Sequence, residues 1–373
     1  MPTGIKLGFG FYHHMLTAEN YRFARQCGAT HAVVHLVDYF GHAREGDGGQ
    51  ESAGANQPLG GDRGWGRAGG SDDRWTLPAL RRLVADMAAE GLEVAAIENF
   101  DPAHWYDVLL DGPRKREQLD RLKQIIRDLG AAGIPVMGYN FSLAGVASRI
   151  SGPFARGGAV SVGMDGVDDT PIPNGMVWNM VWDEDAEPGV VPTITHDQLW
   201  ARLGEFLAEL VPVAEEAGVR LAAHPDDPPA PYVRAQPRLV YQPQLYRRLL
   251  DLQPSRANAL EFCLGSLAEM TDGDVYAVTE EHAAAGDIAY VHFRNVVGKV
   301  PRYHEVFVDE GDIDMARIVE VLVRNGYDGV IIPDHTPLMA GPAGWHAGMA
   351  YAMGYMRALI QQAEGRREVA PTP

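Results

Sequence analysis

The sequence predicts a single (β/α)8 barrel, a closed ring of eight parallel strands surrounded by helices. Short runs rich in β-branched and aromatic residues alternate with longer amphipathic stretches along the chain, which is typical of βαβ units around a parallel sheet. The alternation repeats eight times, and 373 residues suit one such barrel with insertions. An open doubly wound sheet is the alternative, but it usually has a Gly-rich phosphate turn after its first strand, where this chain has FGFYHH.

Each predicted strand is a short apolar run, and the stretches between strands have the periodicity of amphipathic helices and end near a Gly or Asn able to form a C-cap. The predicted strands are LGFGFY (7–12), HAVVHL (31–36), VAAIEN (94–99), VMGYNF (136–141), RLAAHP (220–225), ALEFCLG (259–265), IAYVHFRN (288–295) and GVIIPDH (329–335). The clearest helical stretches are residues 76–91, 116–133, 196–218 and 312–327.

One catalytic domain is predicted over residues 1–365, and two segments interrupt its rhythm. Residues 41–73 are so rich in Gly and polar residues that we expect a flexible loop after the second strand. Residues 145–195 form a long insertion after the fourth strand, which we interpret as a lid or a subunit contact. Both leave the ends of strands at which barrel active sites are built. Residues 366–373 are predicted to be a disordered tail.

Composition excludes several classes of partner. A formal net charge of -18 argues against nucleic acid and anionic membranes, which bind basic surfaces. No apolar run approaches the roughly 20 residues of a membrane span, and the first residues lack the layout of a secretory signal. Cys27 and Cys263 cannot form a disulfide framework. We therefore expect a cytoplasmic protein, and Trp178 and Trp182 in the insertion suggest a homo-oligomer.

Four potential metal ligands lie at or near the ends of the last four predicted strands: His224, Cys263, His292 and Asp334. A single strand Cys or His is usually a core residue, whereas a buried carboxylate is costly unless it is paired or bound to a metal. Four such residues on consecutive strands predict a metal site. Imidazole, thiolate and carboxylate together suit Mn²⁺, Fe²⁺, Co²⁺ or Zn²⁺ better than Mg²⁺ or Ca²⁺.

Further polar residues are expected around this site. Asp226 and Asp227, in HPDDPP, would orient His224, contact substrate or simply build a rigid turn. His335 is the best candidate for a general acid or base, because the ordinary pKa of histidine lies near neutral pH. The substrate-binding candidates at the same mouth are Glu98, Asn140, Arg294, Asn295, His35 and Trp345, and the arginine would pair with a carboxylate.

From about residue 90 onward the chain resembles the mannonate dehydratase family, a divergent match within xylose-isomerase-like barrels. The segments that carry the resemblance are IENF (97–100), LGAAGIPVMGYNFS (129–142), LAAHPDDPP (221–229), LEFCLGS (260–266), VHFRNV (291–296), EGDIDM (310–315) and PDH (333–335). The resemblance implies that the four ligands above bind manganese and that His335 is catalytic. It also implies a carbon–oxygen lyase (a hydro-lyase) that converts D-mannonate to 2-keto-3-deoxy-D-gluconate.

The departures from the family pattern lie at positions that are expected to contact the substrate. Ile332 replaces an Arg, Thr336 and Pro337 replace Gly-Arg, and residues 143–158 replace a Trp-Thr-Arg-Thr segment. A catalytic tyrosine expected after the eighth strand has no clear counterpart, although Trp345 lies nearby. The alternatives are therefore a metal-dependent sugar isomerase, an epimerase or a C-glycoside-processing barrel, and, from another class, a catalytically silent binding protein.

Overall fold

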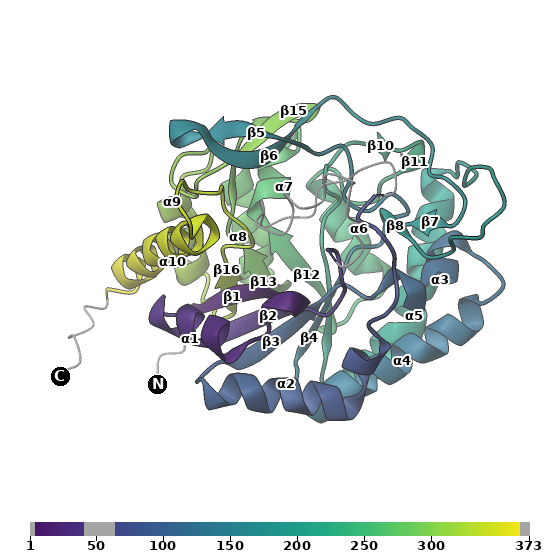
Figure 1. The fold of residues 1–373 in the computed structure, drawn as a ribbon, viewed down its shortest axis with the longest axis horizontal. Coiled ribbons are helices and arrows are strands. Elements are labelled where there is room, and N and C mark those ends of the chain that lie inside the picture. The colour runs from purple at the N-terminus through teal and green to yellow at the C-terminus, as the bar shows by residue number, and fades with distance from the viewer. Residues whose placement is uncertain (1–3, 41–63, 366–373) are drawn as a thin grey trace.

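A computed structural model describes residues 4–40 and 64–365, and its centre is a closed barrel of eight parallel strands, as predicted (Figure 1). The strands follow one another around the barrel in the order β1-β16-β13-β12-β9-β4-β3-β2. They are β1 (Lys6–Tyr12), β2 (His31–His35), β3 (Glu93–Glu98), β4 (Val136–Tyr139), β9 (Arg220–Ala223), β12 (Asn258–Cys263), β13 (Ile288–His292) and β16 (Val330–Ile332). The predicted strands begin within a residue of these bounds, but most run on too far, because the polar residues at their ends turn into loops.

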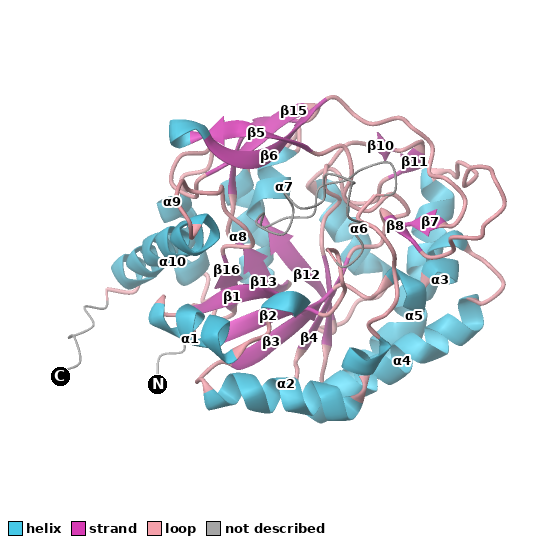
Figure 2. Cartoon of the chain, viewed as in Figure 1, coloured by secondary structure: helices cyan, strands magenta, loops and turns pink. Residues whose placement is uncertain are grey.

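Helices surround the strands (Figure 2). They are α1 (Ala18–Gln26), α2 (Leu77–Ala89), α3 (Tyr106–Leu110), α4 (Lys115–Ala132), α5 (His196–Ala217), α6 (Gln244–Leu252), α7 (Leu264–Glu269), α8 (Val275–Ala285), α9 (Met315–Arg324) and α10 (Gly344–Ala363), with short 3-10 turns at His13–Met15, Asp72–Trp75, Pro102–His104 and Arg156–Gly158. The local sequence sets their ends. For example, α5 begins with a capping box between Thr195 and Gln198 and ends at Gly218, which has a positive φ of 68°.

The two faces of strand β12 contact different regions: one packs against the surrounding helices, and the other points to the inside of the barrel. All six of its residues are buried. Leu260 and Phe262 belong to the apolar core that the strands share with the surrounding helices. Successive side chains of a strand point to opposite faces. Glu261 and Cys263 therefore lie on the opposite face, inside the barrel.

A second, antiparallel sheet stands over the end of the barrel where the strands finish (Figure 2). This sheet, here called the canopy, has the order β14-β15-β6-β5. Its strands are β5 (Ile150–Ala155), β6 (Ala159–Asp165), β14 (Asn295–Lys299) and β15 (Arg302–Val306). The prediction of one strand over residues 288–295 was thus wrong at its end, because β13 stops at His292 and Asn295 begins β14. Two small hairpins complete the sheets: β7 (Met176–Val177) with β8 (Met180–Val181), and β10 (Tyr232–Val233) with β11 (Gln236–Pro237).

The predicted flexible loop spans residues 41–73, of which residues 41–63 lie outside the described part of the chain. Its remaining part is packed against the insertion after β4. The backbone N–H groups of Trp65 and Ala68 donate to the carbonyl oxygens of Asn179 and Val181, and both donor residues are buried. The predicted tail, residues 366–373, also lies outside the described residues.

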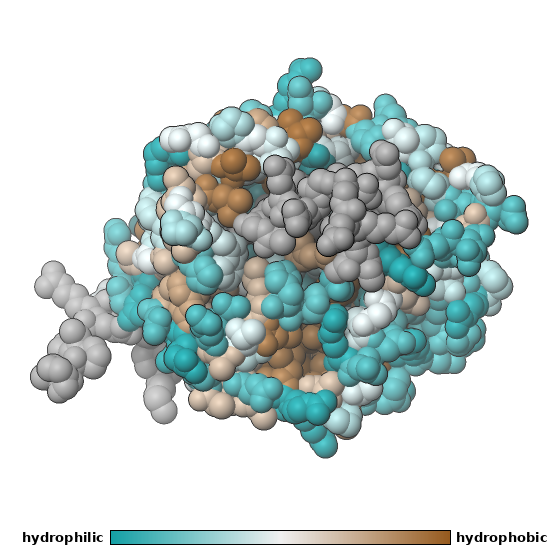
Figure 3. All heavy atoms as spheres, in the orientation of Figure 1, coloured by the Kyte–Doolittle hydropathy of each residue, from teal (hydrophilic) through white to brown (hydrophobic). Residues whose placement is uncertain are grey.

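The two tryptophans behind the expectation of a homo-oligomer pack within their own chain. Trp178 is buried, and Trp182 stacks on Tyr106 with ring centroids 3.8 Å apart. On the face shown in Figure 3, apolar side chains gather in separate small patches. The ring of Trp178 is thus enclosed by its own chain, whereas Trp182 keeps part of its surface exposed.

In the described part of the chain, none of the helices combines the length and the apolar character that crossing a bilayer requires.

Candidate metal centre and active-site pocket

A pocket opens at the strand ends beneath the canopy. Its free volume, mouth included, is about 540 Å³, which lies in the range of small-molecule sites. It is lined by Tyr12, His35, Tyr39, Trp65, Glu98, Asn99, Asn140, Val146, Arg149, Trp178, His224, Asp227, His292, Asp334 and His335. Most of the predicted site residues are therefore brought together, and the exceptions are described below.

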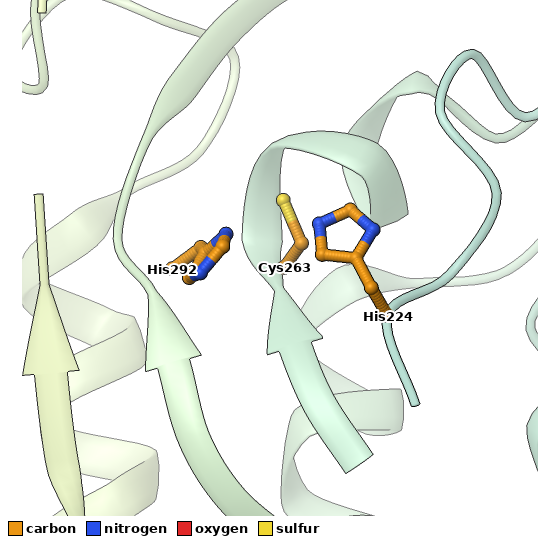
Figure 4. Close-up of side chains that lie close together, drawn as sticks. All are labelled: His224, Cys263 and His292. Atoms are coloured by element: carbon orange, nitrogen blue, oxygen red, sulfur yellow. The ribbon is translucent and has the colours of Figure 1, made fainter. Parts of the chain in front are cut away.

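Three of the four predicted metal ligands converge at the pocket (Figure 4). His224 follows β9, Cys263 ends β12 and His292 ends β13. One potential ligand atom from each lies within 4.8 Å of those of the other two. Adjacent β12 and β13 place Cys263 and His292 directly opposite each other, so the strand register itself creates this cluster.

The hydrogen bonds of the two histidines leave one nitrogen of each available to a metal. Nδ1 of His224 lies 2.6 Å from the carbonyl oxygen of Pro225, which can only accept, so Nδ1 carries the proton. Nε2 of His292 lies 3.2 Å from Oε2 of Glu98. Nδ1 of His292 is buried and makes no hydrogen bond to any described residue. A buried imidazole nitrogen that makes no hydrogen bond but faces the Asp334 carboxylate at 3.4 Å would suit a cation bound between the two groups.

Asp334, the fourth predicted ligand, lies beside this cluster. Its Oδ2 is 3.4 Å from Nδ1 of His292 and 3.0 Å from Nε2 of His335. The backbone of Asp334 has a φ of 62°, a conformation that costs a non-glycine residue energy and is often found at functional sites. The three-residue group within 4.8 Å does not include Asp334, so this carboxylate is placed at the edge of the site.

The charges of the cluster favour a cation. Burial disfavours a thiolate, yet Arg294 and the two imidazoles hold the pKa of Cys263 well below 9. Burial likewise opposes charge on His224, but Cys263 and Glu261 raise its pKa to about 9. Thiolate and imidazole are suitable ligands for borderline divalent metals. The ionised sulfur, which attracts protons onto its neighbours, would equally attract such an ion, and metal binding would release those protons.

Sequence reasoning missed Glu261, the residue before Phe262 in β12. Its side chain is fully buried, and its Oε1 lies 3.2 Å from Nε2 of His292. A charged residue in the middle of the otherwise apolar run ALEFCLG was the available signal, because a buried carboxylate needs a partner.

Arg294 does not face the pocket, contrary to its predicted role in binding a substrate carboxylate. Its guanidinium is held by four carboxylates: Asp227 at 2.8 Å, Glu269 at 2.7 Å, Glu305 at 3.4 Å and Asp334 at 3.5 Å. The arginine is therefore already neutralised by the protein, and the structure makes it a support of the site.

Asn295 also serves the backbone rather than the pocket. Its Nδ2 donates to the carbonyl oxygens of Val308 and Ile313, and its Oδ1 accepts from the N–H of Ile313. These bonds fix the loop after β15. The prediction that Asn295 contacts substrate is not supported, because its amide is fully used within the fold.

Asp226 and Trp345 are likewise placed away from the pocket. Oδ2 of Asp226 accepts from the N–H groups of Leu239 and Val240, both at 2.7 Å, and Oδ1 lies 2.9 Å from Nε of Arg238. The ring of Trp345 packs against Phe9 and Phe23. The carboxylate thus builds the loop after β9, and the indole belongs to the contact between α10 and the barrel.

Asp227 lines the pocket and joins the barrel to the canopy. Its Oδ2 is 2.8 Å from Arg294 and 3.3 Å from Nη2 of Arg149, and its Oδ1 accepts from the hydroxyl of Tyr303 at 3.3 Å. Burial opposes its charge, but Arg294 and Arg149 lower its pKa to about 2. Asp227 is thus an ionised acceptor at neutral pH and cannot donate a proton.

Arg149, at the start of the insertion, was missed by sequence reasoning. It lines the pocket, its side chain is only 9% exposed, and its Nε makes no hydrogen bond to any described residue. Asp227 is its ion-pair partner at 3.3 Å. Arg149 lies in an irregular segment that also contains Arg156, so no periodic pattern indicated which way its side chain points.

His335 lies between the barrel and the canopy. Its Nδ1 is 2.9 Å from Oε2 of Glu305, on β15, and its Nε2 is 3.0 Å from Asp334. Burial disfavours its charge, but Asp334 and Glu305 raise its pKa to about 9. Sequence reasoning found the histidine but not the glutamate, because the hairpin that carries Glu305 was not predicted.

The remaining predicted residues line the pocket. Glu98 is buried, with its Oε1 3.6 Å from Nε2 of His35. Burial opposes its charge, yet His35 and His292 lower its pKa to about 2. Asn140 donates to the carbonyl oxygen of Pro225 at 3.2 Å, and its Oδ1 makes no hydrogen bond to any described residue. The amide oxygen of Asn140 is therefore available at the pocket wall.

Comparison with known proteins points to the same family as the sequence segments, the mannonate dehydratases. The D-mannonate dehydratase family model matches residues 189–366. A mannonate dehydratase of Streptococcus pneumoniae (strain 70585) is 33% identical over 277 residues, which are 70% of this chain and 74% of that protein. A mannonate dehydratase of Streptococcus suis (strain 05ZYH33) is 32% identical, with the same coverage.

Solved structures agree on the fold. The structure of mannonate dehydratase from Streptococcus suis serotype 2 covers 99% of both chains with a TM-score of 0.74 and 24% identity. A xylose isomerase domain protein from Planctomyces limnophilus covers 97% of this chain and all of its own, with a TM-score of 0.56 and 11% identity. The fold is thus a xylose-isomerase-like barrel. By sequence, the chain belongs to the mannonate dehydratase family and is a hydro-lyase that dehydrates a sugar acid.

Proposed function

We propose that this enzyme removes water from D-mannonate, or from a closely related aldonic acid, to give the 2-keto-3-deoxy acid. In this proposal one divalent cation, Mn²⁺ in the first place and Fe²⁺, Co²⁺ or Zn²⁺ as alternatives, is held by His224, Cys263, His292 and Asp334. The observation that supports it is the convergence of two imidazoles and a thiolate on one point at the strand ends. Such a mixed donor set suits these ions.

When bound, the cation would supply Lewis acidity that makes the proton on C2, next to the carboxylate, easier to remove. Arg149 would bind the substrate carboxylate. It is the pocket-lining arginine whose Nε has no partner among the described residues, whereas Arg294 is surrounded by carboxylates. A guanidinium fits a carboxylate through two parallel hydrogen bonds. Arg149 therefore takes the role that the sequence had suggested for Arg294.

The elimination needs two proton transfers: one proton leaves C2, and another joins the hydroxyl that departs from C3, so that water and an enol are formed. The enol then becomes the 2-keto acid by losing the proton of its C2 hydroxyl and gaining one at C3. We assign the first to His335. A cation held by the neighbouring donors would favour its neutral form, since two nearby positive charges repel. We assign the second to the hydroxyl of Tyr12, which lines the pocket. Burial raises the pKa of Tyr12 far above 10, so the hydroxyl keeps its proton at neutral pH.

The experiment is a screen of aldonic acids with the Mn²⁺-loaded enzyme, in which the 2-keto-3-deoxy product is measured. We expect D-mannonate or an epimer of it to be turned over. Conversion of neutral sugars, without turnover of any acid, would instead establish an isomerase or epimerase.

A further inference from the structure

Two buried carboxylates meet the ring of His292 on the side away from Cys263 and Asp334. Oε2 of Glu98, at the end of β3, and Oε1 of Glu261, in β12, each lie 3.2 Å from Nε2 of His292. Both glutamates are buried, with 4% and 0% exposure. The chemistry proposed above uses neither of them. Since two carboxylates at this depth are costly without partners, their common contact with one imidazole requires an explanation.

The sequence of β4 makes room for this arrangement. A Cβ atom at Gly138 would lie 2.4 Å from Oε2 of Glu261, 2.4 Å from the hydroxyl of Tyr290 and 3.3 Å from Cγ of Glu98. Any other residue at this position would collide with the two polar atoms. Because Gly138 has no side chain, the side chains of Glu261, Tyr290 and Glu98 can come together beside His292.

We propose that Glu98 and Glu261 are a positioning pair that holds His292 in the tautomer and ring orientation required to present Nδ1 to the cation. Glu98 accepts the N–H of Nε2, which leaves the lone pair on Nδ1, and the carboxyl group of Glu261 lies against the same nitrogen. Rotation of the ring by half a turn would remove both Nε2 from the carboxylates and Nδ1 from the metal cluster. Partners of this kind, behind a ligating histidine, raise metal affinity in other proteins. The inference rests on the proposed metal site.

The test is the affinity of the metal-free protein for Mn²⁺, measured by titration calorimetry. Glu98→Leu removes the carboxylate that accepts the N–H of His292, and we expect the affinity to fall about 10–100-fold. Glu98→Gln keeps an oxygen that can accept the same N–H, and it should therefore restore most of the affinity. Glu269→Gln is the matched control, because Glu269 is equally buried but pairs with Arg294 and not with His292; its affinity should match that of the wild type.

Wild-type affinity in Glu98→Leu would overturn the inference, as would equal losses in the Leu and Gln variants. If Glu98→Leu does not fold, which thermal unfolding of the metal-free protein would reveal, Glu261→Leu replaces it. This second variant removes the other carboxylate that lies 3.2 Å from Nε2, on a different strand, and should also bind Mn²⁺ about 10–100-fold more weakly. Cys263→Ser is measured in parallel. A metal affinity that it leaves unchanged would refute the proposed metal site itself, and this result differs from failure of the positioning pair alone.

Discussion

The barrel and the canopy contribute to the same pocket in different ways. The barrel strands supply the candidate ligands His224, Cys263 and His292, whose positions follow from the register of β12 and β13. The insertion after β4 and the canopy supply Arg149, Tyr303 and Glu305, which contact the pocket residues from above. Under the proposed function this difference is a division of work: the strand ends would hold the metal, and the added segments would orient the substrate and His335.

The largest effect is expected at the junction of the two regions, from His335→Asn. Loss of a positioned proton-transfer group typically costs about 10²–10⁴-fold in rate. We expect a fall of that size in kcat, with metal content unchanged because the barrel donors remain. Steady-state kinetics and elemental analysis of the same preparation check this. A kcat equal to that of the wild type would remove His335 from the mechanism.

Arg149→Met tests whether the insertion after β4 binds the substrate carboxylate. A hydrogen bond to a charged group is worth about 1.5–3 kcal/mol, so kcat/KM for the acid should fall by roughly 10- to 150-fold. Arg149→Lys should not restore it, because an ammonium lacks the planar pair of donors.

The control is the binding of the corresponding neutral alditol, which should be the same in wild type and Arg149→Met. Equal weakening of acid and alditol would show that the arginine shapes the pocket without reading charge.

Asp227→Asn tests the link between barrel and canopy. Removing this carboxylate leaves Arg294 and Arg149 short of a buried partner, a change that costs about 3–5 kcal/mol of unfolding free energy. The pKa of Asp227 in the folded protein is lowered to about 2, below an unfolded value of about 3.9. Its stabilisation is therefore complete above about pH 4 and is lost as pH falls towards 2. Urea unfolding of both proteins between pH 7 and pH 2.5 should show their difference shrinking with acid; a constant difference would contradict the assignment.

Trp345→Phe should have the smallest effect on catalysis. The indole packs on Phe9 and Phe23 outside the pocket, so KM and kcat should not change. The free energy of unfolding should fall by less than the roughly 3–5 kcal/mol of a full truncation. A raised KM would return Trp345 to the substrate-binding residues.

The barrel could be predicted from the sequence because each of its strands is a local apolar run with a clear end. The same ends located His224, Cys263 and His292, and the strand register then brought them together. Glu261 was within reach of the same reasoning, since a glutamate in an apolar strand signals a buried partner.

The canopy could not be predicted, because its strands pair across two segments far apart in the sequence and carry mixed polar residues. Arg294 shows the limit most clearly. Its position beside a strand end suggested substrate binding, whereas its four carboxylate partners come from two different loops, a canopy strand and a helix end. Whether an arginine is already neutralised depends on these distant contacts, and no local pattern records them.

The most direct test is the metal content of reconstituted wild-type protein and of Cys263→Ser, measured by elemental analysis. The thiolate and two imidazoles should hold about one divalent transition-metal ion per wild-type chain. The serine variant should retain only a small part of it. Wild-type protein that binds no metal, or a serine variant that binds as much as the wild type, would contradict the proposed centre.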